Sequence, residues 1–320
     1  MDAKDKHPRS KRATKGPEKR ISGKHIGIVA HGESKRMASS PAASTDIVFP
    51  GIASPCASTA LTNHGGAFAS GLPVQLIFWG PAWQTLFDPS NPGQLLSDTF
   101  TAAVKSILAG PWISALRQYG VHRCPFGGSM IYTSSGPALL PNTLQEQNVQ
   151  DLLQSLIDDG TFPEPDDAGG ANLYFVMLPP NTQMTPIGNR GAHSSFNSGS
   201  FIDSDNVWYA WIGSNSISGM TSTFCHELAE MCTNPEDGAW FIDGAGPLCF
   251  EIGDVCNLQD GPLKGVNVES YWSIYDGACI IPTAWSVRRT LAAAGITLGG
   301  KGLRSLEDPN ASMNQLIVSL

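Results

Sequence analysis

The apolar residues of this chain gather in short runs, separated by polar, glycine-rich or proline-rich stretches. Three runs are rich in β-branched and aromatic residues and close on glycine or proline, which is typical of buried strands. They span residues 74–80, 173–179 and 207–213. We expect the last of them, VWYAWIG, to be an edge strand beside a cleft, where an extended peptide could add to the sheet.

Two further segments show helical spacing. It extends over residues 97–120 with a break at Gly110-Pro111, and over residues 143–159 up to a stop at Gly160. Strands and helices therefore alternate along the chain, and no internal repeat is visible. This order predicts one α/β domain built on a mixed sheet.

A third helix is predicted in the segment TSTFCHELAEMCTNP, residues 221–235. Ser218 or Thr221 can cap its start, because a hydroxyl accepts a hydrogen bond from a free backbone N–H of the first turn. Asn234-Pro235 fixes its end, because a residue that precedes proline avoids the helical region. The letters HELAE then fall in the middle of this helix.

The faces of the HELAE helix differ in chemistry. His226 and Glu230 lie side by side, one turn apart. Small apolar residues flank them, so most of the helix surface is suited to burial. The opposite face carries an apolar stripe of Phe224, Leu228 and Met231. A buried ionisable pair must be compensated, either by a metal ion or by a hydrogen-bond network.

The spacing of the neighbouring acidic residues favours a metal site. Zinc proteases carry H-E-x-x-H on a helix, and here Glu230 stands in place of the second histidine. Glu251 follows at the distance where thermolysin-like proteases place a third ligand, and Asp254 stands where a carboxylate would brace the ligand histidine. We therefore predict a metal group of His226, Glu230, Glu251 and Asp254, with Glu227 as the general base.

These residues support two kinds of function. The first is a metal-dependent hydrolase, most plausibly a zinc metallopeptidase that acts on peptides. The second is a non-enzymatic extracellular protein that binds a cell-wall or surface ligand and uses a metal or a His–Glu network for rigidity. Zinc is the favoured metal, although a carboxylate in place of histidine leaves manganese, iron and calcium open.

Charge and hydropathy restrict the partners and the location. Residues 1–36 hold 11 of the 20 Lys and Arg, which leaves the rest of the chain strongly acidic and argues against a nucleic-acid partner. The longest apolar stretch of that head, IGIVA, is too short for a standard signal peptide. No run of about 20 apolar residues is present, so we expect no membrane span. We expect a monomer with a disordered basic tail at 1–45, a linker at 46–70 and the domain at 71–320.

Seven cysteines are too few and too scattered for a disulfide scaffold. Five of them fall within residues 225–279. The sequence leaves two alternatives open, which are one or two bridges that brace the C-terminal region, and buried free thiols.

Three stretches, GLPVQLIFWG, HELAEMCTNPEDGAWF and EIGDVCN, resemble in order and spacing the phosphate-induced, EXORDIUM-like proteins, in particular their bacterial members. The resemblance covers roughly residues 71–282 and implies a secreted protein, although the family has no firmly established reaction. It marks as motif residues His226, Glu227, Glu230, Glu251 and Asp254.

Two further stretches are similar to the same family. GAHSSF, in a polar loop before the strand VWYAWIG, contains His193, and YWSIYDGACIIP contains Tyr271. His193 is a candidate for a fourth metal ligand or for a donor to a developing oxyanion, and Tyr271 is a candidate for the donor role. Together with the HExxE helix, the resemblance implies a zincin-like α/β domain in which the mixed sheet packs on a central metal-site helix.

Overall fold

The computed structural model describes residues 47–49, 56, 60–133, 140–141, 143–163, 165, 172–184, 190–198 and 205–283. The expected basic tail at 1–45 and the last residues of the chain, 284–320, lie outside this part. Within the described part, no helix has the length and hydropathy that crossing a membrane requires.

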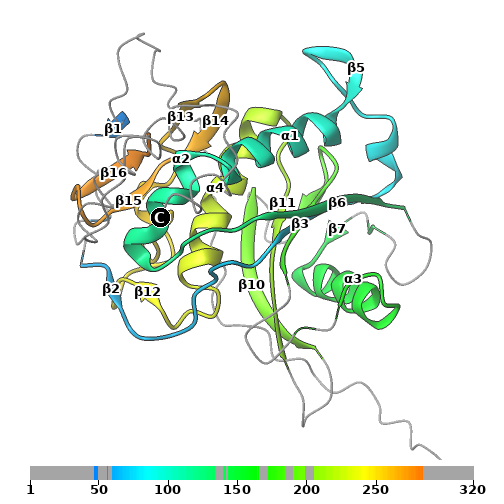
Figure 1. Ribbon diagram of the computed structural model, residues 1–320. Helices are drawn as coiled ribbons and strands as arrows, with labels where there is room; N and C mark the ends of the chain where they lie inside the picture. Colours follow the sequence, from blue (N-terminus) through cyan, green and yellow to red (C-terminus); the bar gives the residue numbers. More distant parts are fainter. Residues whose placement is uncertain are drawn as a thin grey trace, which may run out of the picture.

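A mixed five-stranded sheet forms the centre of the fold (Figure 1). The strand order is β10-β11-β8-β3-β6, with β10 antiparallel to β11 and every other pair parallel. The bounds are β3 (Val74–Trp79), β6 (Phe126–Tyr132), β8 (Leu173–Met177), β10 (Gly191–Ser198) and β11 (Asp205–Ile212).

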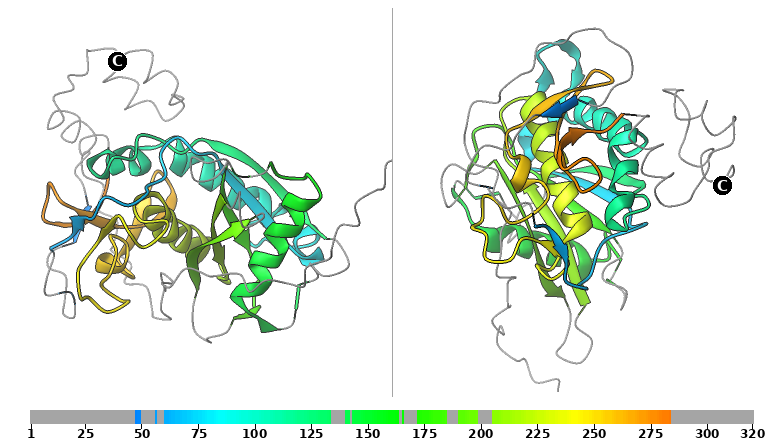
Figure 2. Two further views of the ribbon diagram at one scale, coloured as in Figure 1. Left: turned by 90° about the horizontal axis from the view of Figure 1, so that it is seen from below. Right: turned by 90° about the vertical axis from the view of Figure 1, so that its left-hand side faces the viewer.

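Helices cover both faces of this sheet. The helix α3 lies on one face, and α1 and α4 lie on the other (Figure 1). The bounds are α1 (Leu96–Leu108), α2 (Pro111–Ser114), α3 (Glu146–Asp158) and α4 (Ile217–Thr233), with short 3-10 helices η1 (Pro81–Gln84), η2 (Ala115–Tyr119) and η3 (Asp254–Cys256). In the left view of Figure 2 the C-terminal strands, α4, the sheet and α3 follow one another across the molecule.

Short strand pairs complete the fold. They are β1 (Ile47–Phe49) with β16 (Ala278–Ile281) and β15 (Tyr271–Ser273), β2 (Thr62–Asn63) with β12 (Trp240–Phe241), β13 (Asp260–Leu263) with β14 (Val266–Glu269), β4 (Phe87–Asp88) with β5 (Asn91–Leu95), and β7 (Thr143–Leu144) with β9 (Gln183–Met184).

The alternation of side chains along each strand divides the core in two. In β3, Leu76 and Phe78 join the core shared with α1 and α4, while Ile77 and Trp79 join the core shared with α3. A strand buried on both faces reads as a continuous apolar run, as VQLIFW does. Each fully buried large side chain contributes about 1.5–3 kcal/mol of transfer free energy.

Four aromatic rings tie α1 and α4 to the sheet. Phe78 of β3 contacts Phe100 of α1 with ring centroids 6.1 Å apart, and Phe100 contacts Phe224 of α4 at 5.9 Å. Phe224 in turn packs on Phe175 of β8 at 4.6 Å. The apolar stripe predicted for the HELAE helix is therefore the face that packs on the sheet.

The predicted strands and helices are present, with three differences in detail. VWYAWIG forms β11, which is the second strand and not the edge; the edge is β10, formed by the GAHSSF segment that was expected to be a loop. The serines and the glycine of this segment are not typical of a strand, but the segment pairs with β11 over eight residues. The α4 helix also begins earlier than predicted, because Ser216 is the N-cap and its side chain accepts from the Gly219 N–H.

The segment expected to be a linker, 46–70, contributes to the domain. It supplies β1 and β2, and Cys56 forms a disulfide with Cys249. A second disulfide joins Cys256 to Cys279. Both alternatives for the cysteines are thus realised, because the remaining three are buried free thiols: Cys124, Cys225 and Cys232.

Gly191 allows β10 to lie close against α4. A Cβ atom at this position would lie 2.5 Å from Thr223 Cγ2 and 2.8 Å from Glu227 Oε1. Real Cβ atoms do not approach other atoms so closely, so any larger residue would push the strand and the helix apart.

Substitution of Gly191 by alanine is therefore expected to destabilise the fold by about 1–3 kcal/mol, the usual cost of overpacking a close contact. Chemical denaturation measures this change. Gly213→Ala is the matched control, since a Cβ there meets nothing closer than 3.5 Å. Equal stability of the two variants would show that β10 and α4 are not in close contact.

Candidate metal centre

Histidine and carboxylate side chains gather where α4 meets β10 and the C-terminal segment. The residues that α4 supplies are His226, Glu227 and Glu230, while β10 supplies His193. We call the whole group the His–carboxylate cluster, and its members are His193, His226, Glu227, Glu230, Asp237, Glu251, Asp254 and Glu269. All but Asp237 are at most 2% exposed.

Three members of the cluster lie together in the manner of a ligand set. The ligand atoms of His226, Glu230 and Asp254 lie within 4.8 Å of one another. His226 Nε2 is 3.1 Å from Glu230 Oε1 and 3.7 Å from Asp254 Oδ1. The backbone N–H of Asp254 also donates to Glu230 Oε1 at 3.0 Å, which holds η3 against the helix.

Asp254, and not Glu251, lies beside His226 and Glu230. Asp254, predicted as a brace, is the residue that joins His226 and Glu230. Glu251, predicted as the third ligand, instead lies 3.6 Å from His193 Nε2 and accepts a hydrogen bond from the Asn234 side chain at 2.7 Å. A single turn of chain separates the two carboxylates, so spacing alone did not decide which of them meets His226.

Gly253 brings this turn close to the helix. A Cβ atom at Gly253 would lie 2.7 Å from Glu230 Oε1 and 3.1 Å from His226 Nδ1. The glycine in EIGD is therefore needed for close approach of the backbone, in the same way as Gly191 on the other side of α4.

Glu269, which sequence reasoning missed, fixes the orientation of His226. Its Oε1 lies 3.3 Å from His226 Nδ1 and also accepts from the Leu258 N–H at 2.8 Å. Its Oε2 accepts from the Ser222 hydroxyl at 3.2 Å. A carboxylate at Nδ1 leaves the lone pair on Nε2, which faces Glu230 and Asp254. Nothing in the VNVE segment distinguishes this glutamate from an ordinary surface residue.

His193 reaches the cluster because of the strand alternation in β10. Its neighbour Ala192 packs in the core on the α3 side, so His193 points to the α4 side. His193 Nδ1 lies 3.2 Å from Glu227 Oε2 and 3.3 Å from Glu230 Oε2. His193 therefore lies beside two of the predicted site residues, and its role as a ligand or as a donor stays a prediction.

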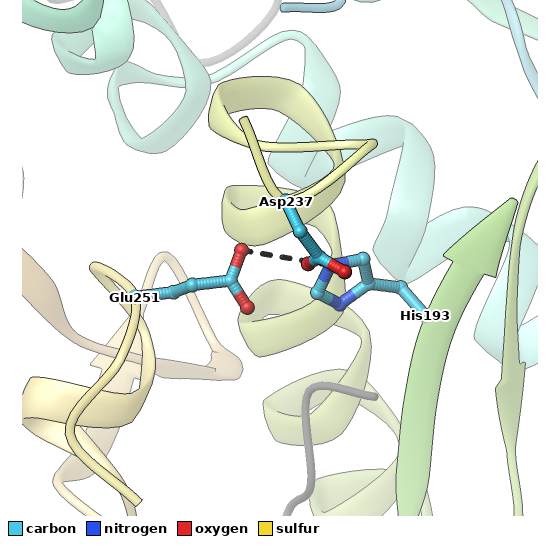
Figure 3. Close-up of side chains that lie close together, drawn as sticks. All are labelled: His193, Asp237 and Glu251. Atoms are coloured by element: carbon cyan, nitrogen blue, oxygen red, sulfur yellow. Dashed lines mark ion pairs between the residues drawn. The ribbon is translucent and has the colours of Figure 1, made fainter. Parts of the chain in front are cut away.

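Asp237 is the second residue that sequence reasoning missed. It is partly exposed and has φ of 57°, a left-handed conformation that aspartate tolerates in turns. Figure 3 shows its carboxylate beside His193 and Glu251, and ligand atoms of these three residues lie within 4.8 Å of one another. The sequence signal, Asp-Gly after Asn-Pro, indicates only a turn.

Tyr271, a candidate from the sequence, lies in the core with α2. Its hydroxyl donates to the Trp112 carbonyl at 2.9 Å, and the two rings meet edge to face at 5.1 Å. The side chain is fully buried in these contacts. It is not among the residues that gather around His193 and His226, so we give it no role there.

Several atoms of the cluster are buried without a hydrogen-bond partner. They are His193 Nε2, His226 Nε2, Glu227 Oε1, Glu230 Oε2 and Asp254 Oδ1. Their close contacts have the distances of ion pairs but not the geometry of hydrogen bonds. Buried polar atoms are nearly always satisfied, so such a concentration needs a physical explanation. A cation among them would satisfy several of these atoms at once.

The carboxylates of the cluster have few cationic side chains to pair with among the described residues. In the described residues, the ion pairs of Glu227, Glu230, Glu251 and Asp254 are all made with histidine. Burial raises the pKa of Glu227 to about 7, against the hydrogen bond from His193. Burial also raises the pKa values of Glu251 and Asp254 well above the ordinary range.

Glu230 and the two histidines shift in the directions expected of ion pairs. Burial alone would raise the pKa of Glu230, but the charge on His226 and the contacts with His193 lower it to about 2. Burial would likewise lower the pKa of both histidines. The surrounding carboxylates outweigh this effect and hold both histidine pKa values well above 6.5.

Apart from Asp237, the cluster is enclosed by protein. A surface pocket of about 450 Å³ lies elsewhere, along Ile242–Cys249 and Cys56, and no cluster residue lines it. A small ion can enter an enclosed site through local fluctuations, whereas an extended peptide needs a lasting opening.

Comparisons of the chain with protein-family models, with curated proteins and with solved structures found no match in any of the three. The resemblance to the phosphate-induced, EXORDIUM-like proteins therefore stays a prediction, as does the zincin-like form of the fold. Function has to be inferred from the geometry of the chain's own residues.

The metal-free protein is expected to lose stability as the pH rises from about 5.5 to 8.5. The folded chain keeps protons on Glu227, His193 and His226 that the unfolded chain releases, so unfolding becomes easier as pH rises through this window. Glu230 acts in the opposite sense, but only below about pH 4.5. Melting temperatures measured in a chelating buffer test this.

If the cluster binds zinc, added zinc should raise the melting temperature more at pH 8.5 than at pH 5.5, because ligands must lose their protons to bind metal. Glu227→Gln should flatten the pH dependence of the metal-free protein by removing one of the titrating groups. A metal-free melting temperature that rises steadily with pH would contradict the protonation pattern described above.

Proposed function

We propose that this protein holds a divalent metal ion in the His–carboxylate cluster, with His226, Glu230 and Asp254 as ligands. The observation that carries the proposal is the convergence of ligand atoms from three buried residues, of which His226 Nε2 and Asp254 Oδ1 have no hydrogen-bond partner. Glu269 supports it, because its contact with Nδ1 presents Nε2 of His226 to the ion.

The donor set favours a transition metal. One imidazole and two carboxylates suit zinc, which commonly takes such mixed ligands, and they also suit manganese and iron. Calcium prefers a larger shell made only of oxygen atoms, so it fits less well. Zinc is therefore the first metal to test and manganese the second.

A zincin-like fold and secretion belong to the same proposal. The first is supported by a metal-site helix that packs against a mixed sheet whose edge strand, β10, is antiparallel to its neighbour. The second is supported by the two disulfides, since such bonds persist in oxidising compartments.

The metal centre is tested by Asp254→Asn, which removes a charged ligand with little change of shape. Its metal content, measured by elemental analysis after dialysis against zinc, should fall by about one ion per chain. The melting temperature in zinc should fall with it. Asp98→Asn, an exposed change in the first turn of α1, is the control and should bind as the wild type does. Equal metal content in the two variants would remove Asp254 from the centre.

A second candidate function, metal-dependent hydrolysis of a peptide, is favoured by Glu227. The Oε1 atom of this buried carboxylate has no hydrogen-bond partner, and its pKa of about 7 suits proton transfer near neutral pH. A divalent cation in such a site can polarise a carbonyl group and make water a better nucleophile. Glu227 would take the proton from water and pass it to the leaving group.

The enclosure of the cluster is the argument against catalysis. A peptide could reach Glu227 only if the protein around α4 opened. Glu227 also has a structural use, because its Oε2 lies 3.2 Å from His193 Nδ1. Without an opening, the metal would serve rigidity, and the protein would be a binding module for a cell-wall or surface ligand.

Glu227→Gln separates these two functions. The amide keeps an oxygen that can accept from His193, so metal content should stay unchanged. If the protein is a hydrolase, turnover of a peptide library should fall about 10²–10⁴-fold, the usual cost of losing a general base. The assay compares wild type and variant at matched metal content.

Turnover that survives unchanged in Glu227→Gln would exclude the proposed role of this residue. A fully metal-loaded wild type that cleaves no member of the library would favour the binding module.

A further inference from the structure

The two histidines of the cluster are held in the same way. His226 Nδ1 faces Glu269 at 3.3 Å, and His193 Nδ1 faces Glu227 at 3.2 Å. In both residues Nε2 is buried without a hydrogen-bond partner. A carboxylate that accepts from Nδ1–H keeps the proton on that nitrogen, so in the neutral ring, which is the form that binds metal, Nε2 presents the lone pair.

The two lone pairs face different carboxylates. Around His226 Nε2 stand the carboxylates of the proposed metal centre. Glu251 lies 3.6 Å from His193 Nε2, and Asp237 completes a group whose ligand atoms lie within 4.8 Å of one another (Figure 3). No residue is shared between these two groups of one histidine and two carboxylates. The arrangement that marks the first metal centre is therefore repeated in a second place.

Asn234 positions both carboxylates of the second group. This C-cap residue of α4 donates to Glu251 Oε1 at 2.7 Å, and its own Oδ1 accepts from the Ala239 N–H at 2.7 Å. The second bond closes the turn that carries Asp237. Both carboxylates are thus set by the same side chain at the end of the metal-site helix.

The second group differs from the first in access. Asp237 is partly exposed, whereas His193 and Glu251 are at most 2% exposed. An ion could therefore enter from the Asp237 side without disturbing α4. Asp237 has a left-handed backbone conformation, with φ of 57°. Most other residue types adopt this conformation only at a cost.

We propose that His193, Asp237 and Glu251 form a second divalent cation site, so that the loaded protein carries two ions. This inference extends the proposed function, since it assigns a second ion to the same cluster. Glu230 lies between the two histidines, with Oε1 3.1 Å from His226 Nε2 and Oε2 3.3 Å from His193 Nδ1. The two sites are therefore neighbours, as in hydrolases that clamp a substrate oxygen between two metals.

Asp237→Asn tests the second site with little risk to folding. Asparagine tolerates the same left-handed backbone conformation, so the turn should persist, while one charged ligand is lost. Chelator-treated protein is titrated with zinc and, separately, with manganese by calorimetry at neutral pH. Wild type and the Asp98→Asn control should bind two ions, Asp237→Asn one, and Asp237→Asn/Asp254→Asn none.

The outcomes separate this inference from the proposed function. One ion in both wild type and Asp237→Asn, lost in Asp254→Asn, would overturn the second site and leave the first intact. No ion in the wild type would overturn both. Loss of both ions in Asp237→Asn, with an unchanged circular dichroism spectrum, would show one joint site and also overturn the inference.

Discussion

The charge balance of the buried His–carboxylate cluster, where α4 meets β10, is the constraint on which the rest of this structure depends. Carboxylates are costly to bury, and here at least five are buried beside only two histidines. Proton uptake or a cation must make up the difference. The packing of the fold therefore serves two purposes, since it keeps water away from these groups and holds them where one ion could balance several of them.

The two glycines that flank α4 show how the fold meets this constraint. Gly191 lets the edge strand approach the helix from one side, and Gly253 lets the η3 turn approach from the other. Each approach adds one more group to those of the helix, His193 from the strand and Asp254 from the turn. The cluster is thus assembled from several separate segments around one helix, and its geometry depends on how closely those segments can lie.

The sequence predicted the parts of this assembly that are local. Apolar spacing located α4, its sheet-facing stripe and the strands β3, β8 and β11, because burial imposes period and length directly on the residues. The HExxE letters identified three cluster residues for the same reason, since i and i+4 positions must meet on a helix. Contacts between distant segments left weaker signals. In the sequence, Glu269 and Asp237 resemble ordinary surface acids. Glu251 and Asp254 lie only one turn of chain apart, so their spacing did not decide which of them meets His226.

The Cys56–Cys249 disulfide has a consequence for the order in which the protein forms. Its partners lie 193 residues apart, so the bridge cannot close until nearly all of the sheet and α4 have been synthesised. The segment that it anchors also precedes Glu251 and Asp254 directly. Once closed, the bridge limits how far the segment that leads into Glu251 and Asp254 can move away from the rest of the fold.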